Sequence, residues 1–151
     1  MPCGEKLEVP FDGHFLRRFR DSDNHRVWDY DKKAWVPSPE ALQFDPDLSG
    51  SWNEHLKESH GLGPASVASD GYPLVGEWLV SDIRALDFEV EHTPQGSLPI
   101  ECAHTSVWWP ISALKQGKTE PDKPTRRRLR SVLAGDMSWA HGEISAKPPD
   151  A

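Results

Sequence analysis

The chain has 151 residues and a formal net charge of −7, with 36% hydrophobic and 27% charged residues. A domain of this length buries a core without disulfide or metal staples, and no apolar run approaches the roughly 18 residues that a membrane span needs. The acidic net charge disfavours nucleic acid and anionic membranes as partners. No secretory signal follows Met1, and the two cysteines are too few for a disulfide framework, so we expect a cytoplasmic protein.

Short strands are expected near the N-terminus. The first ten residues show no periodicity and predict a frayed arm. The first strand is expected over His14–Phe19. Two β-prone runs, Val27–Tyr30 and Ala34–Val36, flank a polar triplet. This arrangement predicts a hairpin in which one tryptophan from each strand packs against the other.

The clearest helix start lies at Ser51. Ser51 and Glu54 have capping-box spacing, in which the hydroxyl accepts from one free backbone N–H and the carboxylate from another. The helix is expected to run from Trp52 to about His60. Gly61 then supplies a left-handed C-cap.

The second half of the chain is predicted to alternate between strands and turns. Residues 72–86 favour a strand followed by a helical turn near Ser81. Phe88–Glu91 alternates with period two and is expected to be a half-buried strand. Leu98–Trp109 is the strongest candidate for a central strand, and Pro110 ends it.

A C-terminal helix is expected from about Thr125 to Ala134, opened by Asp122. Leu129, Val132 and Leu133 have the spacing of a buried stripe. Fourteen prolines and eleven glycines argue against long helices elsewhere. The sequence therefore predicts an α+β fold with a mixed or antiparallel sheet. We expect one domain over residues 1–142 and a disordered tail over 143–151.

Seven tryptophans are many for one small domain, and two of them are adjacent. Trp108 and Trp109 cannot both point inwards on a strand, because neighbouring side chains take opposite faces. One of them is therefore expected at a surface, a groove or a second core. Exposed tryptophan is typical of interface hot spots, which favours a protein that binds a partner.

A basic segment supports the same interpretation. Five positive charges and no acid fall within eight residues of the C-terminal helix, which leaves a net charge of −12 for the rest of the chain. This segment is either a solvated face or a site for an acidic protein surface, and nucleic acid is the less expected partner because the remainder of the chain would repel it. The leading hypothesis is a small soluble accessory or regulatory protein without a cofactor. Its expected partner-binding residues are Trp108, Trp109, Arg126, Arg127, Arg128 and Arg130.

The alternative hypothesis is an enzyme that uses NAD. Arg17 and Arg18 precede the serine pair Ser49 and Ser51, an aromatic residue follows that pair, and Glu89-Val90-Glu91 comes later. This order resembles the motif order of the arginine–serine–glutamate class of ADP-ribosyltransferases, although that class has Ser-Thr-Ser where this chain has Ser-Gly-Ser.

The resemblance implies a role for each of these residues. Arg17 or Arg18 would hold the NAD phosphates, as a bidentate donor suits them. Ser49 or Ser51 would fix the ribose side. Glu91 would stabilise the oxocarbenium-like ribose and orient the acceptor, with Glu89 as the first acid.

A metal-dependent hydrolase is the third hypothesis. Glu54, His55, Glu58 and His60 crowd the first helix, and Cys102 and His104 are expected on one strand face. The spacing matches neither the CxxC nor the HExxH pattern, so we expect no metal. Cys102 is a candidate nucleophile with His104 as its base, but the preferred interpretation is a buried core cysteine.

Overall fold

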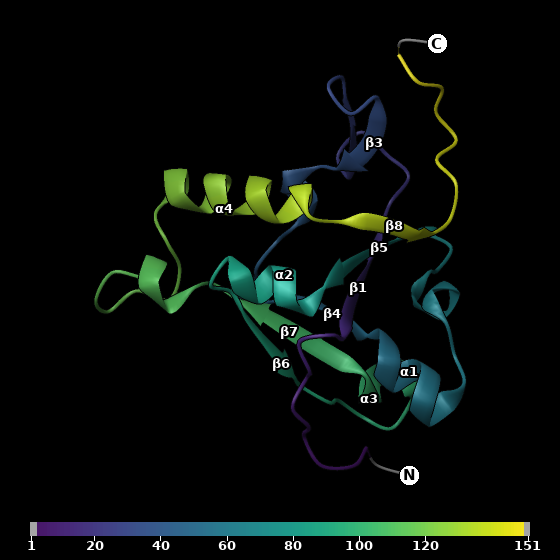
Figure 1. The fold of residues 1–151 in the computed structure, drawn as a ribbon, viewed down its shortest axis with the longest axis vertical. Coiled ribbons are helices and arrows are strands. Elements are labelled where there is room, and N and C mark those ends of the chain that lie inside the picture. The colour runs from purple at the N-terminus through teal and green to yellow at the C-terminus, as the bar shows by residue number, and fades with distance from the viewer. Residues whose placement is uncertain (1–2, 150–151) are drawn as a thin grey trace.

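A six-stranded antiparallel sheet forms the centre of the fold, with the strand order β6-β7-β4-β1-β5-β8 (Figure 1). The computed structural model describes residues 3–149. The strands of the sheet are β1 (His14–Phe19), β4 (Leu48–Trp52), β5 (Leu74–Leu79), β6 (Glu89–His92), β7 (His104–Trp108) and β8 (Ser138–His141). All their pairings are antiparallel, so the predicted α+β fold class is confirmed.

Four α-helices and a separate hairpin complete the regular structure of residues 3–149. The helices are α1 (Asn53–His60), α2 (Val80–Ala85), α3 (Pro99–Cys102) and α4 (Lys123–Gly135). The hairpin joins β2 (Arg26–Asp29) to β3 (Ala34–Pro37) and lies beside the C-terminal end of α4 (Figure 1), where the Lys32 ammonium donates to the carbonyl oxygen of Gly135 at 3.4 Å. Short 3₁₀ turns cover residues 39–41, 64–67 and 111–113.

The larger core lies on one face of the sheet. Phe15 and Phe19 of β1 and Trp78 of β5 are buried there, in one cluster with Leu129 and Leu133 of α4. The Trp78 indole N–H also donates to the carbonyl oxygen of Leu133 at 2.8 Å. Burial of these large apolar side chains holds α4 against this face.

The opposite face carries a smaller core and the polar side chains. Leu16, Leu56 and Val75 are buried in this second cluster. Side chains alternate between faces along a strand. Ser49 and Ser51 therefore point away from the larger core, which their β4 neighbours Leu48 and Trp52 help to form. By the same alternation, Arg18 on β1 and His104 on β7 also lie on the polar face.

Several expected elements are confirmed. The first strand covers His14–Phe19 as predicted. The hairpin places Trp28 opposite Trp35, with the two rings edge to face at 5.4 Å. Residues 72–86 form a strand and then a short helix. Asp122 caps α4 by accepting from the backbone N–H of Thr125 at 3.0 Å.

The predicted helix cap at Ser51 is wrong. Ser51 lies in β4, is 3% exposed and pairs with Leu16 and His104 on the neighbouring strands. The helix begins one residue later than expected, at Asn53, and has no side-chain cap. Glu54 accepts a hydrogen bond from the backbone N–H of His14 at 2.6 Å instead. Strand pairing with β1 on one side and β7 on the other outweighs the local capping pattern at Ser51. The predicted left-handed Gly61 at the helix end is confirmed.

The predicted central strand over Leu98–Trp109 is also wrong. Its first part is the short helix α3, and β7 begins only at His104. Glu101 accepts hydrogen bonds from the backbone N–H groups of Ser97 and Leu98 at 3.2 and 3.0 Å, which favours a turn over an extended chain. Cys102 therefore lies on a helix and shares no strand face with His104. On α4, Val132 is 43% exposed, so it does not belong to the buried stripe.

The N-terminal arm is attached to the sheet, contrary to the predicted fraying. Cys3 and Cys102 form a disulfide, the backbone N–H of Leu7 donates to His92 Nδ1 at 2.9 Å, and Val9 is 3% exposed. The prediction of an unpaired core cysteine at Cys102 is therefore wrong, since no local signal connects two residues 99 positions apart. No helix within residues 3–149 is long and apolar enough to cross a membrane.

Candidate anion-binding pocket

A cavity of about 510 Å³ lies over the middle strands of the sheet. Side chains from β1, β4 and β7 line it, together with the turn at residues 39–41 and Tyr72. Its polar lining residues include Arg17, Arg18, His25, Ser49, Ser51, Tyr72 and His104. The antiparallel pairing of β1 with β4, and of β4 with β7, brings these groups together although they are far apart in the sequence.

Arg17 is a half-buried cation held by neutral groups. Its guanidinium donates to the carbonyl oxygens of Ser49 at 2.6 Å and Ala41 at 3.2 Å. Its Nε is buried and has no hydrogen-bond partner among the described residues. Burial, and then the neighbouring charge of Arg18, lowers the pKa of Arg17 to about 10. The guanidinium therefore remains protonated at neutral pH and has unused hydrogen-bonding capacity.

Two further arginines meet at Tyr72. The guanidinium carbons of Arg18 and Arg20 lie 4.6 and 4.7 Å from the centre of the tyrosine ring, within cation–π distance. Arg20 also donates to the Tyr72 hydroxyl at 2.9 Å. This hydrogen bond, followed by the charge of Arg20, lowers the pKa of Tyr72. The tyrosine thus orders two guanidinium groups without neutralising them.

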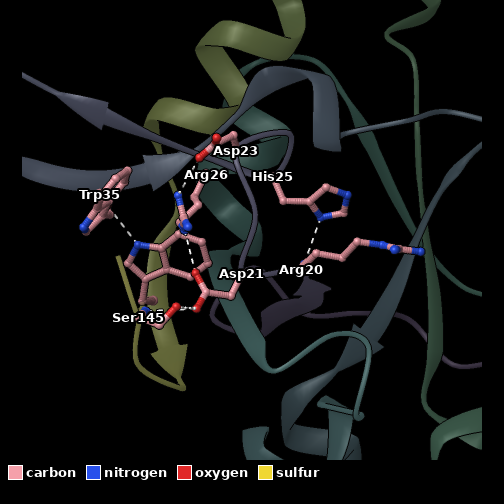
Figure 2. Close-up of polar contacts among 8 residues, drawn as sticks. Arg20, Asp21, Asp23, His25, Arg26, Trp35 and Ser145 are labelled. Carbon is pink, nitrogen blue, oxygen red and sulfur yellow. Dashed lines mark hydrogen bonds and ion pairs between the residues drawn. The ribbon is translucent and has the colours of Figure 1, made fainter. Parts of the chain in front are cut away.

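The nearest carboxylates in the sequence are used elsewhere. Figure 2 shows Asp21 and Asp23 turned towards Arg26, to which they lie at 2.6 and 3.3 Å, while the Arg20 side chain extends away from them. Arg26 is 6% exposed and its guanidinium also covers the Trp35 ring.

No ion pair within 4.0 Å joins Arg17, Arg18 or Arg20 to a carboxylate of residues 3–149. Glu40 is exposed and is the single carboxylate among the residues that line the cavity. The pocket therefore carries a local excess of positive charge on a chain whose net charge is −7.

Two histidines and two serines add neutral polar groups. His25 Nδ1 accepts from the backbone N–H of Arg20 at 2.9 Å, so the proton of the neutral ring is on Nε2. Burial, and then the charges of Arg20 and Arg17, lowers the pKa of His25. His104 Nδ1 lies 2.8 Å from the Thr93 hydroxyl and 3.1 Å from the Thr93 carbonyl oxygen.

The glutamates of the transferase motif do not line this cavity. Glu91 forms an ion pair with Lys6 and accepts from the Trp108 indole N–H at 3.1 Å. Glu89 and Glu91 line a separate hollow beside the N-terminal arm. The strand β7 lies between β6, which carries the glutamates, and β4, which carries the serines. The sheet therefore unites the predicted arginines and serines but not the predicted acids.

The two adjacent tryptophans face different surroundings. Trp109 is 4% exposed and stacks on Phe44 with a centroid distance of 3.8 Å. Trp108 is half-buried at the end of β7 and bonds to Glu91. Trp109 therefore belongs to the core and offers no surface to a partner. On α4, Arg127 and Arg128 are exposed, whereas Arg126 and Arg130 are half-buried.

The remaining predicted groups form no catalytic cluster. Both cysteines are consumed by the disulfide, so Cys102 is not a free thiol. Within residues 3–149, no group of three or more His, Cys, Asp or Glu side chains has the geometry to hold a metal ion.

The sequence did not predict His25 and Tyr72 as pocket residues, nor Arg20, which lies against Tyr72. The usable signal was the group of three arginines, Arg17, Arg18 and Arg20, which lie within four residues at the end of the predicted strand with no acidic residue among them. Comparisons with protein-family models, curated proteins and solved structures found no match.

Proposed function

We propose that the protein binds a small molecule carrying a phosphate group in the pocket that Arg17 and Arg18 line, with Arg20 beside it on Tyr72. The observation that carries this proposal is the convergence of three arginines without an ion-paired carboxylate. Arg18 and Arg20 are exposed, whereas Arg17 is half-buried and its buried Nε has no hydrogen-bond partner among the described residues. Withdrawing a charge from water costs free energy unless it is paired, and an anionic ligand would supply that partner.

The ligand class follows from the shape and chemistry of the lining. A guanidinium presents a planar fork of donors that matches phosphate oxygens, and several such groups favour a ligand with more than one negative charge. The cavity of about 510 Å³ is in the size range of small-molecule sites. Serine and histidine groups suit a sugar, and Val67 and Ile100 suit an apolar ring. A nucleoside diphosphate fits this combination.

Calorimetric titration with ADP, and with adenosine as the phosphate-free control, tests the proposal. We expect ADP to bind and adenosine to bind at least about tenfold more weakly, which corresponds to about 1.4 kcal/mol. Arg18→Gln should weaken ADP binding by a similar factor. Arg128→Gln, which removes an exposed charge outside the pocket, is the matched control and should not change it. Equal affinity for adenosine and ADP, or no binding of ADP, contradicts the proposal.

NAD is a further ligand to titrate, because the sequence resemblance implies an NAD-using enzyme. That enzyme hypothesis additionally requires Glu91 to act on the ribose. In the fold Glu91 is engaged by Lys6 and Trp108 outside the pocket, so binding of a phosphate-bearing ligand is the better supported function. Release of nicotinamide from NAD that depends on both Arg18 and Glu91 would favour the enzyme instead.

The cytoplasmic location remains a prediction. The disulfide between Cys3 and Cys102 weighs against it, because disulfides persist mainly in oxidising compartments. Thiol labelling of the protein taken directly from its cells would distinguish the two possibilities.

A further inference from the structure

A second hollow, of about 650 Å³, separates α4 from the β2–β3 hairpin and the turn at residues 39–41. We call it the α4 groove. Four basic side chains line its helix wall: Lys123, Arg126, Arg127 and Arg130. They are spaced i, i+3, i+4 and i+7, which places them on one face of the helix. Arg128 is not among the lining residues, because it points away from that face.

Two of these arginines lack an anionic partner. Arg126 contacts Glu120 at 3.3 Å and donates to the carbonyl oxygen of Pro121 at 2.7 Å. Arg127 and Arg130 form no ion pair with the described residues, and the buried Nε of Arg130 has no hydrogen-bond partner there. Burial lowers the pKa of the Arg130 side chain.

The opposite wall adds an apolar contact and little negative charge. Val27 is 42% exposed and lines the groove. Of the two carboxylates there, Asp23 is already paired with Arg26 at 3.3 Å. Glu40 lines both this groove and the anion pocket, so it lies between the two hollows and separates them.

We propose that the α4 groove binds an acidic peptide segment of a partner protein, in which carboxylates meet Arg127 and Arg130 and an apolar side chain meets Val27. Charge complementarity carries the proposal. The four basic side chains of the groove are local, and the rest of the chain has a net charge of −11. A nucleic acid extends beyond a short groove and would be repelled by that remainder, whereas a short acidic segment would not. This proposal is independent of ligand binding in the anion pocket.

Fluorescence anisotropy tests it with a labelled peptide of alternating glutamate and leucine. We expect saturable binding that weakens as salt is raised, because exposed charges are screened within about 8 Å at physiological ionic strength. Arg127→Glu combined with Arg130→Gln should weaken binding at least about tenfold. Arg128→Glu makes a charge change on the same helix outside the groove and should have less than about a twofold effect. The far-ultraviolet circular dichroism of each variant should match that of the parent protein.

Four results would overturn the proposal. The first is equal binding of the same peptide with glutamine in place of glutamate, and the second is an equal loss of binding in Arg128→Glu. The third is tighter binding of a labelled single-stranded oligonucleotide than of the acidic peptide, which would make the groove a nucleic-acid site. Absence of any binding by the folded parent protein also contradicts it.

Discussion

Ser145 donates both its backbone N–H and its hydroxyl to Asp21 Oδ2, at 2.9 and 2.6 Å, across a sequence separation of 124 residues. Figure 2 shows Asp21 between this serine and Arg26. The contact attaches the segment after β8 to the loop before β2. Together with Arg26, which donates to Asp21 Oδ1 at 2.6 Å, it engages both oxygens of this carboxylate.

The first prediction concerns acid stability. The Ser145 hydroxyl, followed by Arg26, lowers the pKa of Asp21 from 3.8 to about 2. Because the folded value is the lower one, the ionised carboxylate stabilises the fold above pH 4, and that stabilisation is lost as pH falls from about 4 to 2. Asp21→Asn should therefore reduce stability at pH 6 and flatten the pH dependence between 4 and 2, measured by urea unfolding.

The control for this experiment is Asp23→Asn. Asp23 contacts the same Arg26 but is fully exposed, so its removal should have a small effect at every pH. If Asp21→Asn loses as much stability between pH 4 and 2 as the parent protein does, other carboxylates govern acid unfolding.

The second prediction compares the contributions of Glu54 and Ser51 to stability at the start of α1. Glu54 accepts from the backbone of His14 at 2.6 Å and contacts the imidazole Nδ1 at 2.9 Å. Glu54→Ala should cost about 1–2 kcal/mol, because it removes hydrogen bonds to a charged group. Ser51→Ala should cost less, since Ser51 caps no helix. Denaturant melts of the two variants give the ranking, and the reverse order would restore the capping interpretation.

The third prediction concerns the N-terminal arm. The disulfide between Cys3 and Cys102 closes a long loop, and loss of such a crosslink typically costs about 2–4 kcal/mol. Cys3→Ser should therefore lower the stability and increase the amide exchange rate of Leu7, whose N–H is bonded to His92. Reduction of the parent protein with dithiothreitol should reproduce both effects. A parent protein whose stability is insensitive to the reductant would show that the arm is held without the crosslink.

The fourth prediction contrasts two adjacent tryptophans. Trp109 is buried and stacked on Phe44, so Trp109→Ala should cost about 3–5 kcal/mol. Trp108 is half-buried, and Trp108→Ala should cost clearly less because less apolar surface is lost. Thermal and urea unfolding measure both. Equal losses would mean that both rings are core residues.

The sequence was informative where a structure is decided by neighbouring residues. The first strand, the Trp28–Trp35 hairpin and the Asp122 cap of α4 each depend on residues within one turn or one hairpin. The local sequence patterns therefore predicted these three features correctly. The split of Trp108 and Trp109 between two surroundings also followed from the local geometry of a strand.

The candidate pocket could be predicted only in part. Arg17, Arg18, Ser49 and Ser51 were selected from the sequence, and all four line the cavity because β1 pairs with β4. Tyr72 and His25 were missed, since nothing near them in the sequence indicates contact with β1. Glu91 was grouped with the arginines, but the strand order inserts β7 between β6 and β4.

The order of the strands and the pairing of the two distant cysteines were decided by tertiary structure alone. Ser51 fits a capping box locally, yet ladder bonds to two neighbouring strands place it in β4. The two cysteines meet only because the arm packs along the edge of the sheet, with Val9 in the core. The physical reason is the same in both cases. Local preferences are worth about 1 kcal/mol each, whereas burial of a large apolar side chain contributes about 1.5–3 kcal/mol, so the packing of distant segments determines which local pattern is used.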